Sequence, residues 1–263
     1  MIGEKTMQKK IEDGKYIIFL DIDNTVYDGK KVPEKNIIAL AKARAEGHKV
    51  FINTGRAHCI VTKDIIDAIK PDGIISSMGT AIFIGDEQIY SAVMDEDDIE
   101  YLVKFGDDRD IFVIIESVEK LVSLKGPAFL GQNNFLGSAS KLREKYPDMN
   151  VSKISLMKHL SGEEIKILES RFPIVYAHEN YAEIPTAGHN KATGIARVCE
   201  YYGIDVSRSI AMGDSVNDDE MIKFAGIGVA MGNATEKIKA AADFITLDCK
   251  DGGVAYALEK FIF

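Results

Sequence analysis

Two aspartates separated by one residue follow a short apolar run near the start of the chain. Asp21 and Asp23 come directly after residues 16–20, which we predict to be a buried strand. In an extended chain, side chains two residues apart point the same way, with about 6.6 Å of rise between them. Two carboxylates at that spacing repel each other, so they favour a divalent cation or a division of labour between an ionised and a protonated acid. An ordinary acidic turn at a strand end is the alternative interpretation.

A hydroxyl, a glycine and a lysine follow at two further element boundaries. Thr54 and Gly55 come just after residues 49–52, a second predicted strand, where a hydroxyl and backbone N–H groups can bind an anion. Lys191 begins a predicted helix, where its charge opposes the helix dipole, and it could pair with a phosphoryl group. Taken singly, Thr54 also fits a plain turn, and Lys191 also fits a solvated surface charge.

The densest group of acids follows residues 209–212, another predicted strand. Asp214 and Asp218 are four residues apart, and Asn217 lies between them. If a helix begins near Asp214, the two carboxylates share a face, where like charges are mildly destabilising. Ligation of a hard cation through oxygen explains this group better than the alternative, an acidic first turn that complements the helix dipole.

The elements that must position these residues alternate between strand and helix. The first 83 residues predict strands over 16–20, 49–52 and 73–76, with helices over 34–45 and 58–69 between them. From residue 191 onward the same rhythm returns, with helices over 191–202, 218–224, 235–241 and 254–261 and strands over 209–212, 227–230 and 244–246. This pattern predicts an α/β core with a doubly wound, Rossmann-like parallel sheet, in which ligands bind at the carboxyl ends of the strands.

The middle of the chain lacks this rhythm. Gly85-Asp86 between residues 81–84 and 88–92 predicts a hairpin, and a mixture of further helices and strands follows it. We therefore predict an inserted α+β cap domain at residues 84–185, between two core segments at residues 1–83 and 186–263. Residues 123–131 and 178–181 are candidate substrate contacts in this insert, with ordinary solvated loops as the alternative.

Composition sets limits on the function. The 263 residues carry 32 basic and 41 acidic side chains, a net charge of −9, which makes nucleic acid a poor candidate partner. No apolar run approaches the ~18–20 residues of a membrane span. Three widely spaced cysteines and the lack of a recognisable targeting segment predict a cytoplasmic protein with reduced thiols. No obligate protein partner is evident from the sequence.

Carboxylates, a hydroxyl and a lysine at one sheet edge suit Mg²⁺-assisted phosphoryl transfer. That reaction needs a carboxylate nucleophile, an acid–base group, a cation held by oxygen ligands, and donors for the phosphoryl oxygens.

The chain resembles the haloacid dehalogenase-like (HAD) hydrolases, and among them the Cof-type phosphatases, which carry a large C2B-type α/β cap between their second and third motifs. The matching segments are, in chain order, Asp21-Ile22-Asp23-Asn24-Thr25, Asn53-Thr54-Gly55-Arg56, Lys191 and Gly213-Asp214-Ser215-Val216-Asn217-Asp218. Two positions depart from the common pattern: Asn24 and Ala192 stand where glycine is frequent.

The resemblance implies a role for each matching residue. Asp21 would attack phosphorus and become an aspartyl-phosphate, and Asp23 would protonate the leaving alcohol and then activate water. The phosphoryl oxygens would be held by Thr54, Gly55, Lys191 and Asn217. Mg²⁺ would be bound by Asp21, Asp214 and the backbone carbonyl of Asp23, with support from Asp218.

The resulting hypothesis is a Mg²⁺-dependent phosphatase that hydrolyses a small phosphorylated metabolite, most simply a sugar phosphate. A phosphomutase resembling phosphomannomutase is the alternative with the same core chemistry. A remoter alternative is a non-catalytic phospho-accepting switch similar to receiver domains, but Asp23, the late acidic pair and the insert all disfavour it. A dinucleotide-binding oxidoreductase is weaker still, because no G-x-G-x-x-G opens the first predicted helix.

Overall fold

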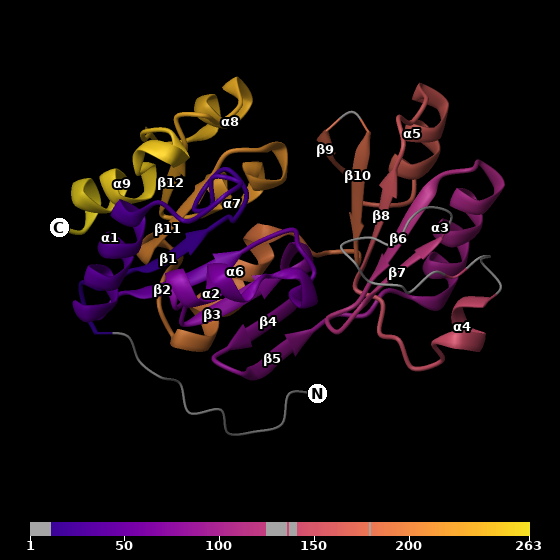
Figure 1. Ribbon diagram of the computed structural model, residues 1–263, viewed down its shortest axis with the longest axis horizontal. Coiled ribbons are helices and arrows are strands. Elements are labelled where there is room, and N and C mark those ends of the chain that lie inside the picture. Colours follow the sequence, from indigo (N-terminus) through magenta and orange to yellow (C-terminus); the bar gives the residue numbers. More distant parts are fainter. Residues whose placement is uncertain (1–11, 125–135, 137–140, 179) are drawn as a thin grey trace.

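The computed structural model of the chain describes residues 12–124, 136, 141–178 and 180–263. It has two lobes, each built on its own β-sheet (Figure 1). The first and the last described segments belong to the larger lobe, which we call the core, and the smaller lobe, the cap, is formed by the middle of the chain. Within the described residues, no helix is long and apolar enough to cross a membrane.

The core sheet has eight strands in the order β13-β12-β11-β1-β2-β3-β4-β5. Their bounds are β1 (Ile17–Leu20), β2 (Lys49–Asn53), β3 (Gly73–Ser76), β4 (Ala81–Ile84), β5 (Glu87–Ser91), β11 (Ser209–Gly213), β12 (Ile227–Ala230) and β13 (Phe244–Ile245). The six strands from β13 to β3 are parallel, and β4 and β5 run antiparallel at one edge. All four residues of β1 are fully buried, as expected for a parallel strand covered on both faces.

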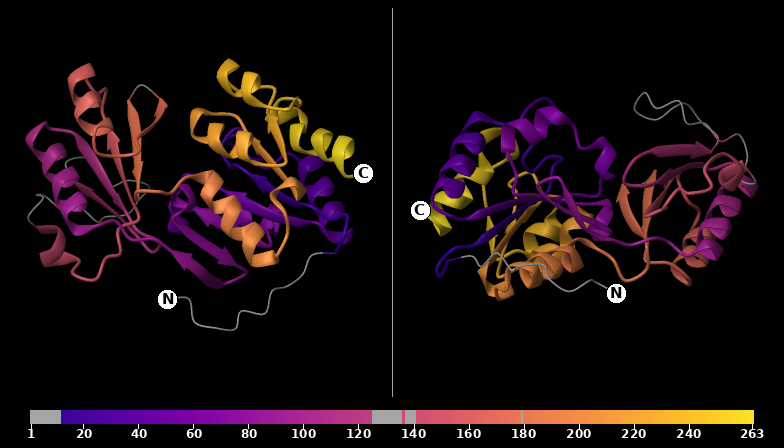
Figure 2. Two further views of the ribbon diagram at one scale, coloured as in Figure 1. Left: turned by 180° about the vertical axis from the view of Figure 1, so that it is seen from behind. Right: turned by 90° about the horizontal axis from the view of Figure 1, so that it is seen from below.

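Helices cover both faces of the core sheet (Figure 2). One face carries α1 (Glu34–Ala45), α2 (Lys63–Ile69) and α9 (Gly253–Phe261), and the other carries α6 (Lys191–Tyr202), α7 (Asp219–Phe224) and α8 (Glu236–Ala241). The prediction of a doubly wound parallel sheet is therefore confirmed. The predicted helix over residues 58–69 is in fact a short 3₁₀ turn, His58–Ile60, followed by α2, because Val61 and Thr62 adopt extended backbone angles.

The predicted hairpin belongs to the core sheet. β5 pairs with β4, which itself pairs with β3, so the predicted boundary at residue 84 would cut through one continuous sheet. The Ala92 N–H still donates to the Thr80 carbonyl in the core, whereas the Met94 N–H donates to the Val151 carbonyl in the cap. The hydrogen bonding thus places the passage from core to cap at residues 92–94. The predicted return at residue 185 coincides with the end of β10.

The cap sheet has five strands in the order β7-β6-β8-β10-β9, all antiparallel. The strands are β6 (Phe112–Glu116), β7 (Leu121–Leu124), β8 (Lys153–Met157), β9 (Val175–His178) and β10 (Tyr181–Pro185), and the helices are α3 (Glu96–Asp108), α4 (Leu142–Lys145) and α5 (Gly162–Glu169). β7 and β8 have no counterpart among the predicted elements. Most of the candidate segment at residues 123–131 lies outside the described residues.

The two faces of the cap sheet differ in chemistry. The apolar side chains that alternate along β6, β8 and β10 pack with α3 into the cap core, and these are Val113, Ile115, Ile154, Leu156, Ala182 and Ile184. The residues between them face the core lobe, and beside the apolar Ile114 and Met157 they include the polar Glu116, Lys153, Ser155, Tyr181 and Glu183. This alternation is the normal consequence of a strand whose successive side chains point to opposite faces.

Phe51 is central to the packing that positions the edge of β2. Its ring is fully buried, 5.7 Å from the ring centroid of Phe19 and 6.0 Å from that of Tyr202 on α6. We expect Phe51→Ala to lower the free energy of unfolding by about 3–5 kcal/mol, because a large aromatic side chain leaves a cavity. Urea unfolding measures this, with Ile38→Ala, at a position 62% exposed on α1, as the control. A loss no larger than that of the control would contradict this packing role.

Candidate active site

Asp21 and Asp23 lie in the loop that follows β1, at the carboxyl edge of the core sheet. The Asp21 N–H donates to the Met212 carbonyl of the neighbouring strand β11, and its carboxylate is buried. The Asp23 side chain, by contrast, is 54% exposed. Asn24 has a φ of 57°, a left-handed conformation that asparagine tolerates and glycine adopts freely, so this departure from the family pattern is structurally compatible.

Lys191 is the first residue of α6 and is completely buried. Its Nζ lies 2.6 Å from Asp21 Oδ1, 2.6 Å from Asp218 Oδ1 and 3.3 Å from Asn217 Oδ1. Asn190 is the N-cap residue of α6. Its side-chain oxygen accepts from the Thr193 N–H, and the Thr193 hydroxyl oxygen accepts from the Asn190 N–H. The Asn53 amide at the end of β2 also donates to the Lys191 carbonyl at 3.0 Å. Lys191 is therefore held by its own helix and by the adjacent strand.

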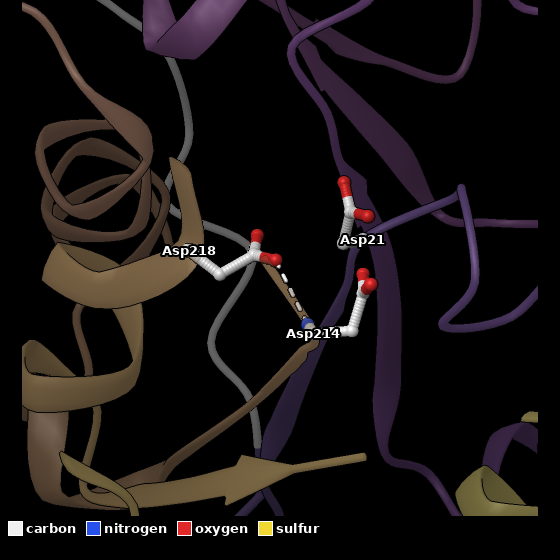
Figure 3. Close-up of side chains that lie close together, drawn as sticks. All are labelled: Asp21, Asp214 and Asp218. Carbon is white, nitrogen blue, oxygen red and sulfur yellow. Dashed lines mark hydrogen bonds between the residues drawn. The ribbon is translucent and has the colours of Figure 1, made fainter. Parts of the chain in front are cut away.

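Asp214 and Asp218 face Asp21 from the loop after β11 (Figure 3). The Asp218 Oδ2 atom accepts hydrogen bonds from the backbone N–H groups of Asp214 and Ser215, at 2.9 and 3.0 Å. The Asp214 Oδ1 atom accepts from the Thr25 hydroxyl at 3.3 Å. Gly213 is required here, because a Cβ at this position would lie 2.4 Å from Asp218 Cγ. The structure thus brings Asp21, Asp214 and Asp218 together, although the first and the last are far apart in sequence.

Burial dominates the electrostatics of Asp21 and Asp214. Burial raises the pKa of Asp214 to about 7, and the nearby Asp218 adds to the rise. Burial also raises the pKa of Asp21 well above its usual range, although Lys191 opposes this. For Lys191, burial alone would lower the pKa, yet attraction to Asp21 and Asp218 raises it, so the ammonium remains protonated.

The acidic cluster has the composition of a site for a hard cation. One oxygen from each of Asp21, Asp214 and Asp218 lies within 4.8 Å of the other two. Three ionised carboxylates and one ammonium sum to −3 + 1 = −2, which a single divalent cation would neutralise. Carboxylate oxygens are the ligands that Mg²⁺ and Ca²⁺ prefer. Since Asp218 is already engaged by two N–H groups and Lys191, Asp21 and Asp214 have the freer oxygens.

Thr54, Gly55 and Asn217 line the pocket above this cluster. The Thr54 hydroxyl oxygen accepts the Arg56 N–H at 3.1 Å, and Asn217 Oδ1 accepts from the Ser215 hydroxyl at 2.9 Å. All eight predicted site residues therefore lie at one edge of the core sheet. Most of them follow β1, β2 and β11, which are parallel neighbours in the sheet, and Lys191 begins α6. Separated segments of the chain therefore converge at this edge.

Arg56 forms an ion pair that sequence reasoning did not identify. Its Nε donates to Asp23 Oδ2 at 2.9 Å, and its Nη2 donates to Asp23 Oδ1 at 2.5 Å. This two-point geometry fixes the Asp23 carboxylate at the side of the pocket. Arg56 was visible only as the last residue of the Asn53-Thr54-Gly55-Arg56 segment, and nothing in its spacing indicated the partner.

A pocket of about 550 Å³ lies between the two lobes, and its core wall includes Asp21, Asp23, Thr54, Gly55, Asp214 and Asn217. The cap supplies the opposite wall through Ile114, Glu116, Lys153, Met157, Tyr181 and Glu183. Tyr181 lies in the candidate segment at residues 178–181, but the charged residues of this wall were missed. The signal that could have found them is the alternation of polar and apolar residues along β8 and β10.

The raised pKa of Asp214 makes stability depend on pH in the cation-free protein. Its folded value of about 7 exceeds the ordinary 3.8, so the proton stabilises the fold below about pH 4, and this contribution is lost as pH rises through 7. We expect Asp214→Asn to raise the melting temperature of the cation-free protein relative to wild type at pH 8, with little gain at pH 4.

Added Mg²⁺ should raise the wild-type melting temperature more at pH 8 than at pH 5, because the cation competes with the proton. The Asp214→Asn variant should lose most of that gain. Asp219→Asn is the control, since Asp219 pairs with Lys223 and Lys237 instead. An equal response of both variants to Mg²⁺ would contradict the assignment of Asp214 as a ligand.

Comparison with known proteins identifies the family of the chain. A model of the haloacid dehalogenase-like hydrolase family matches residues 18–258. A Bacillus subtilis protein named "Putative phosphatase YkrA" is 31% identical over 255 residues, which cover 93% of this chain and 96% of that protein. Another Bacillus subtilis protein, 5-amino-6-(5-phospho-D-ribitylamino)uracil phosphatase YitU, is 27% identical over 275 residues and covers 95% of this chain and 99% of its own length.

The fold has close counterparts among solved structures. That of the HAD subclass IIB sugar phosphatase BT4131 superimposes with a TM-score of 0.83 at 26% identity, over 94% of this chain and 99% of that one. The resemblance drawn from the sequence motifs is thus confirmed. The chain belongs to the Cof-type haloacid dehalogenase-like hydrolases and is a phosphoric monoester hydrolase.

Proposed function

We propose that this phosphatase uses Mg²⁺ and an aspartyl-phosphate on Asp21 to hydrolyse a small sugar phosphate. The observation that carries the proposal is the position of the Lys191 ammonium. It lies 2.6 Å from the carboxylates of both Asp21, which lines the pocket, and Asp218, with Asp214 beside them. A fixed cation next to a buried carboxylate stabilises the charge that develops on a phosphoryl group during transfer.

Asp21 is the nucleophile in this proposal. One of its oxygens forms a bond to phosphorus while the bond from phosphorus to the leaving alcohol breaks. Lys191, the Thr54 hydroxyl and the Asn217 amide then hold the phosphoryl oxygens that carry the charge. A water molecule subsequently attacks phosphorus, the bond to Asp21 breaks, and inorganic phosphate leaves with the carboxylate restored.

Asp23 moves the protons. It gives a proton to the leaving alcohol in the first step and takes one from the attacking water in the second. Arg56 occupies both oxygens of the Asp23 carboxylate, so Asp23 must exchange Arg56 for the leaving oxygen before it can give that oxygen a proton.

Mg²⁺ would be held by Asp21 and Asp214, with the backbone carbonyl of Asp23 as a further ligand and Asp218 as support. When bound, it supplies positive charge that offsets the net −2 of the cluster and screens the repulsion between Asp21 and the incoming phosphate.

Pocket size and relatives support a sugar phosphate as the substrate. A volume of about 550 Å³ suits a small metabolite. The solved relative BT4131 is a sugar phosphatase, and the relative YitU is named for a substrate that is a phosphate ester of a ribityl chain. Both descriptions concern polyhydroxylated phosphate esters. A panel of phosphorylated sugars, nucleotides and cofactors, assayed with Mg²⁺ and with chelator, tests this choice, and isomerised sugar phosphate in place of free phosphate would indicate a mutase.

Asp21→Asn should lower the rate of phosphate release by at least about 10³-fold, because the amide cannot serve as the nucleophile. Phosphate release from the best substrate of the panel measures this, and the melting temperature shows whether the fold is kept. Asp219→Asn is the matched control, since its carboxylate binds surface lysines. Turnover that stays within about tenfold of wild type would contradict the assignment of Asp21.

Asp23→Asn should leave phosphate bound covalently when the leaving group is a good one, such as p-nitrophenolate, because attack needs no acid but hydrolysis needs a base. Acid-quenched protein analysed by mass spectrometry should then carry one added phosphate. The Asp21→Asn/Asp23→Asn double variant should carry none. A phosphorylated double variant would show that another residue accepts the phosphoryl group.

A further inference from the structure

A buried cluster of charged side chains lies on the face of the cap sheet that is turned toward the core. Glu116, Lys153 and Glu183 come from β6, β8 and β10, which are neighbours in that sheet, and each is at most 3% exposed. Lys153 Nζ lies 3.3 Å from Glu116 Oε1 and donates a hydrogen bond to Glu183 Oε1. Burial alone would lower the pKa of Lys153, but the two glutamates raise it, so the cluster contains an ammonium.

Two bonds join this cluster to the phosphate-binding residues of the core. Lys153 Nζ donates to the Gly55 carbonyl at 2.7 Å, and Asn217 Nδ2 donates to Glu183 Oε2 at 3.4 Å. Gly55 lacks a side chain, and a Cβ built there would lie 3.1 and 3.2 Å from the two Glu183 carboxylate oxygens. Glycine at this position thus lets the charged cluster of the cap approach the backbone of the turn that Thr54, Gly55 and Arg56 form after β2.

The bond to Gly55 fixes the orientation of a whole peptide unit. The carbonyl of Gly55 and the N–H of Arg56 belong to one planar group and point in opposite directions. Lys153 holds the carbonyl from the cap, and the N–H donates to Thr54 Oγ1 at 3.1 Å. Because that oxygen accepts a bond from the backbone, the proton of the Thr54 hydroxyl is directed elsewhere, and Thr54 lines the pocket.

Stability alone does not explain the cluster. Taking an ammonium and two carboxylates out of water is costly, and apolar residues of similar volume often serve a fold as well or better. The cap already has an extensive apolar core on the opposite face of this sheet. Only a polar group can form a directional hydrogen bond to the other lobe.

We propose that Lys153 is a positioning residue for phosphoryl transfer: by holding the Gly55 carbonyl, it couples closure of the cap to the orientation of the Thr54 hydroxyl. This inference rests on the proposed function and deepens it. Lys153 acts on the phosphoryl half of the substrate through the turn and does not act on the leaving group. Its contribution is therefore the same for every phosphate ester that the enzyme accepts.

The test is a double-mutant cycle between Lys153→Met and Thr54→Val, with kcat and KM measured for p-nitrophenyl phosphate and for the best sugar phosphate. Lys153→Met should lower kcat by about 10- to 100-fold for both substrates and change KM by less than about threefold. In the Thr54→Val background the same change should lower kcat less than about twofold, because its effect passes through Thr54. Lys158→Met, an exposed lysine that follows β8, should match wild type.

Folding of the variants is controlled separately. Lys153→Met leaves two buried acids without their cation, so the Lys153→Met/Glu183→Gln variant, which removes one charge of each sign, is measured beside it, with melting temperatures for both. Lys153→Arg keeps a donor and should recover part of kcat. Binding of orthovanadate in the presence of Mg²⁺ gives a readout that needs no turnover. Lys153→Met should weaken this binding when Thr54 is unchanged, but not in the Thr54→Val background.

Three results would overturn the inference: wild-type kcat in a folded Lys153→Met protein, additive losses in the double variant, or a loss confined to KM for the sugar phosphate. The last would mean that Lys153 contacts the leaving group. Each of these needs an active wild-type enzyme. A wild-type protein that releases phosphate from no ester and binds no orthovanadate contradicts the proposed function itself, and the two failures are thereby distinguished.

Discussion

The structure of the site depends on one ammonium group buried among three carboxylates. Lys191 is fully buried and bonded to Asp21 and Asp218, and Asp214 completes the cluster. A charge in such a place is tolerated only when it is paired and hydrogen-bonded. The three carboxylates and the ammonium together carry a net charge of −2 when all are ionised, and a divalent cation or protons would reduce it. Burial, together with the neighbouring carboxylates, raises the pKa values of Asp21 and Asp214.

The topology of the core sheet explains why these groups meet. From β1 the chain proceeds to β2 and β3 on one side, whereas β11 leads to β12 and β13 on the other. The loops after β1 and β11 therefore diverge from adjacent strands and leave a crevice between them, as at other switch points of doubly wound sheets. Asp21 and Asp214 stand at the two sides of this crevice. Locally, Gly213 leaves room for the Asp218 side chain, and the N-cap residue Asn190 fixes the start of α6, where Lys191 lies.

Local patterns predict the core better than the cap. β3, β12, α1 and α6 have the predicted bounds, because strands buried on both faces are continuous apolar runs and α6 has clear signals at both ends. The predicted site residues lie close together because the carboxyl ends of parallel strands share one edge of the sheet. The position of Lys153 could not be predicted from the sequence, since β8 is a short strand whose neighbours are set by antiparallel pairing between distant segments. The ion pair between Asp23 and Arg56 likewise depends on how two loops lie side by side.

Within the part of the chain that the structure describes, the contacts between the lobes are both polar and apolar. Besides the bonds to Gly55 and Asn217, they include a small apolar cluster in which Ala57 of the core packs against Ile114 and Leu121 of the cap. Interfaces between the domains of one chain generally permit relative motion, and such motion would admit substrate and release phosphate. The polar bonds are then the informative part of the contact. Apolar packing tolerates small displacements, whereas a hydrogen bond weakens steeply with misalignment. In our proposal, the bond from Lys153 to the Gly55 carbonyl therefore forms fully only when the cap is closed.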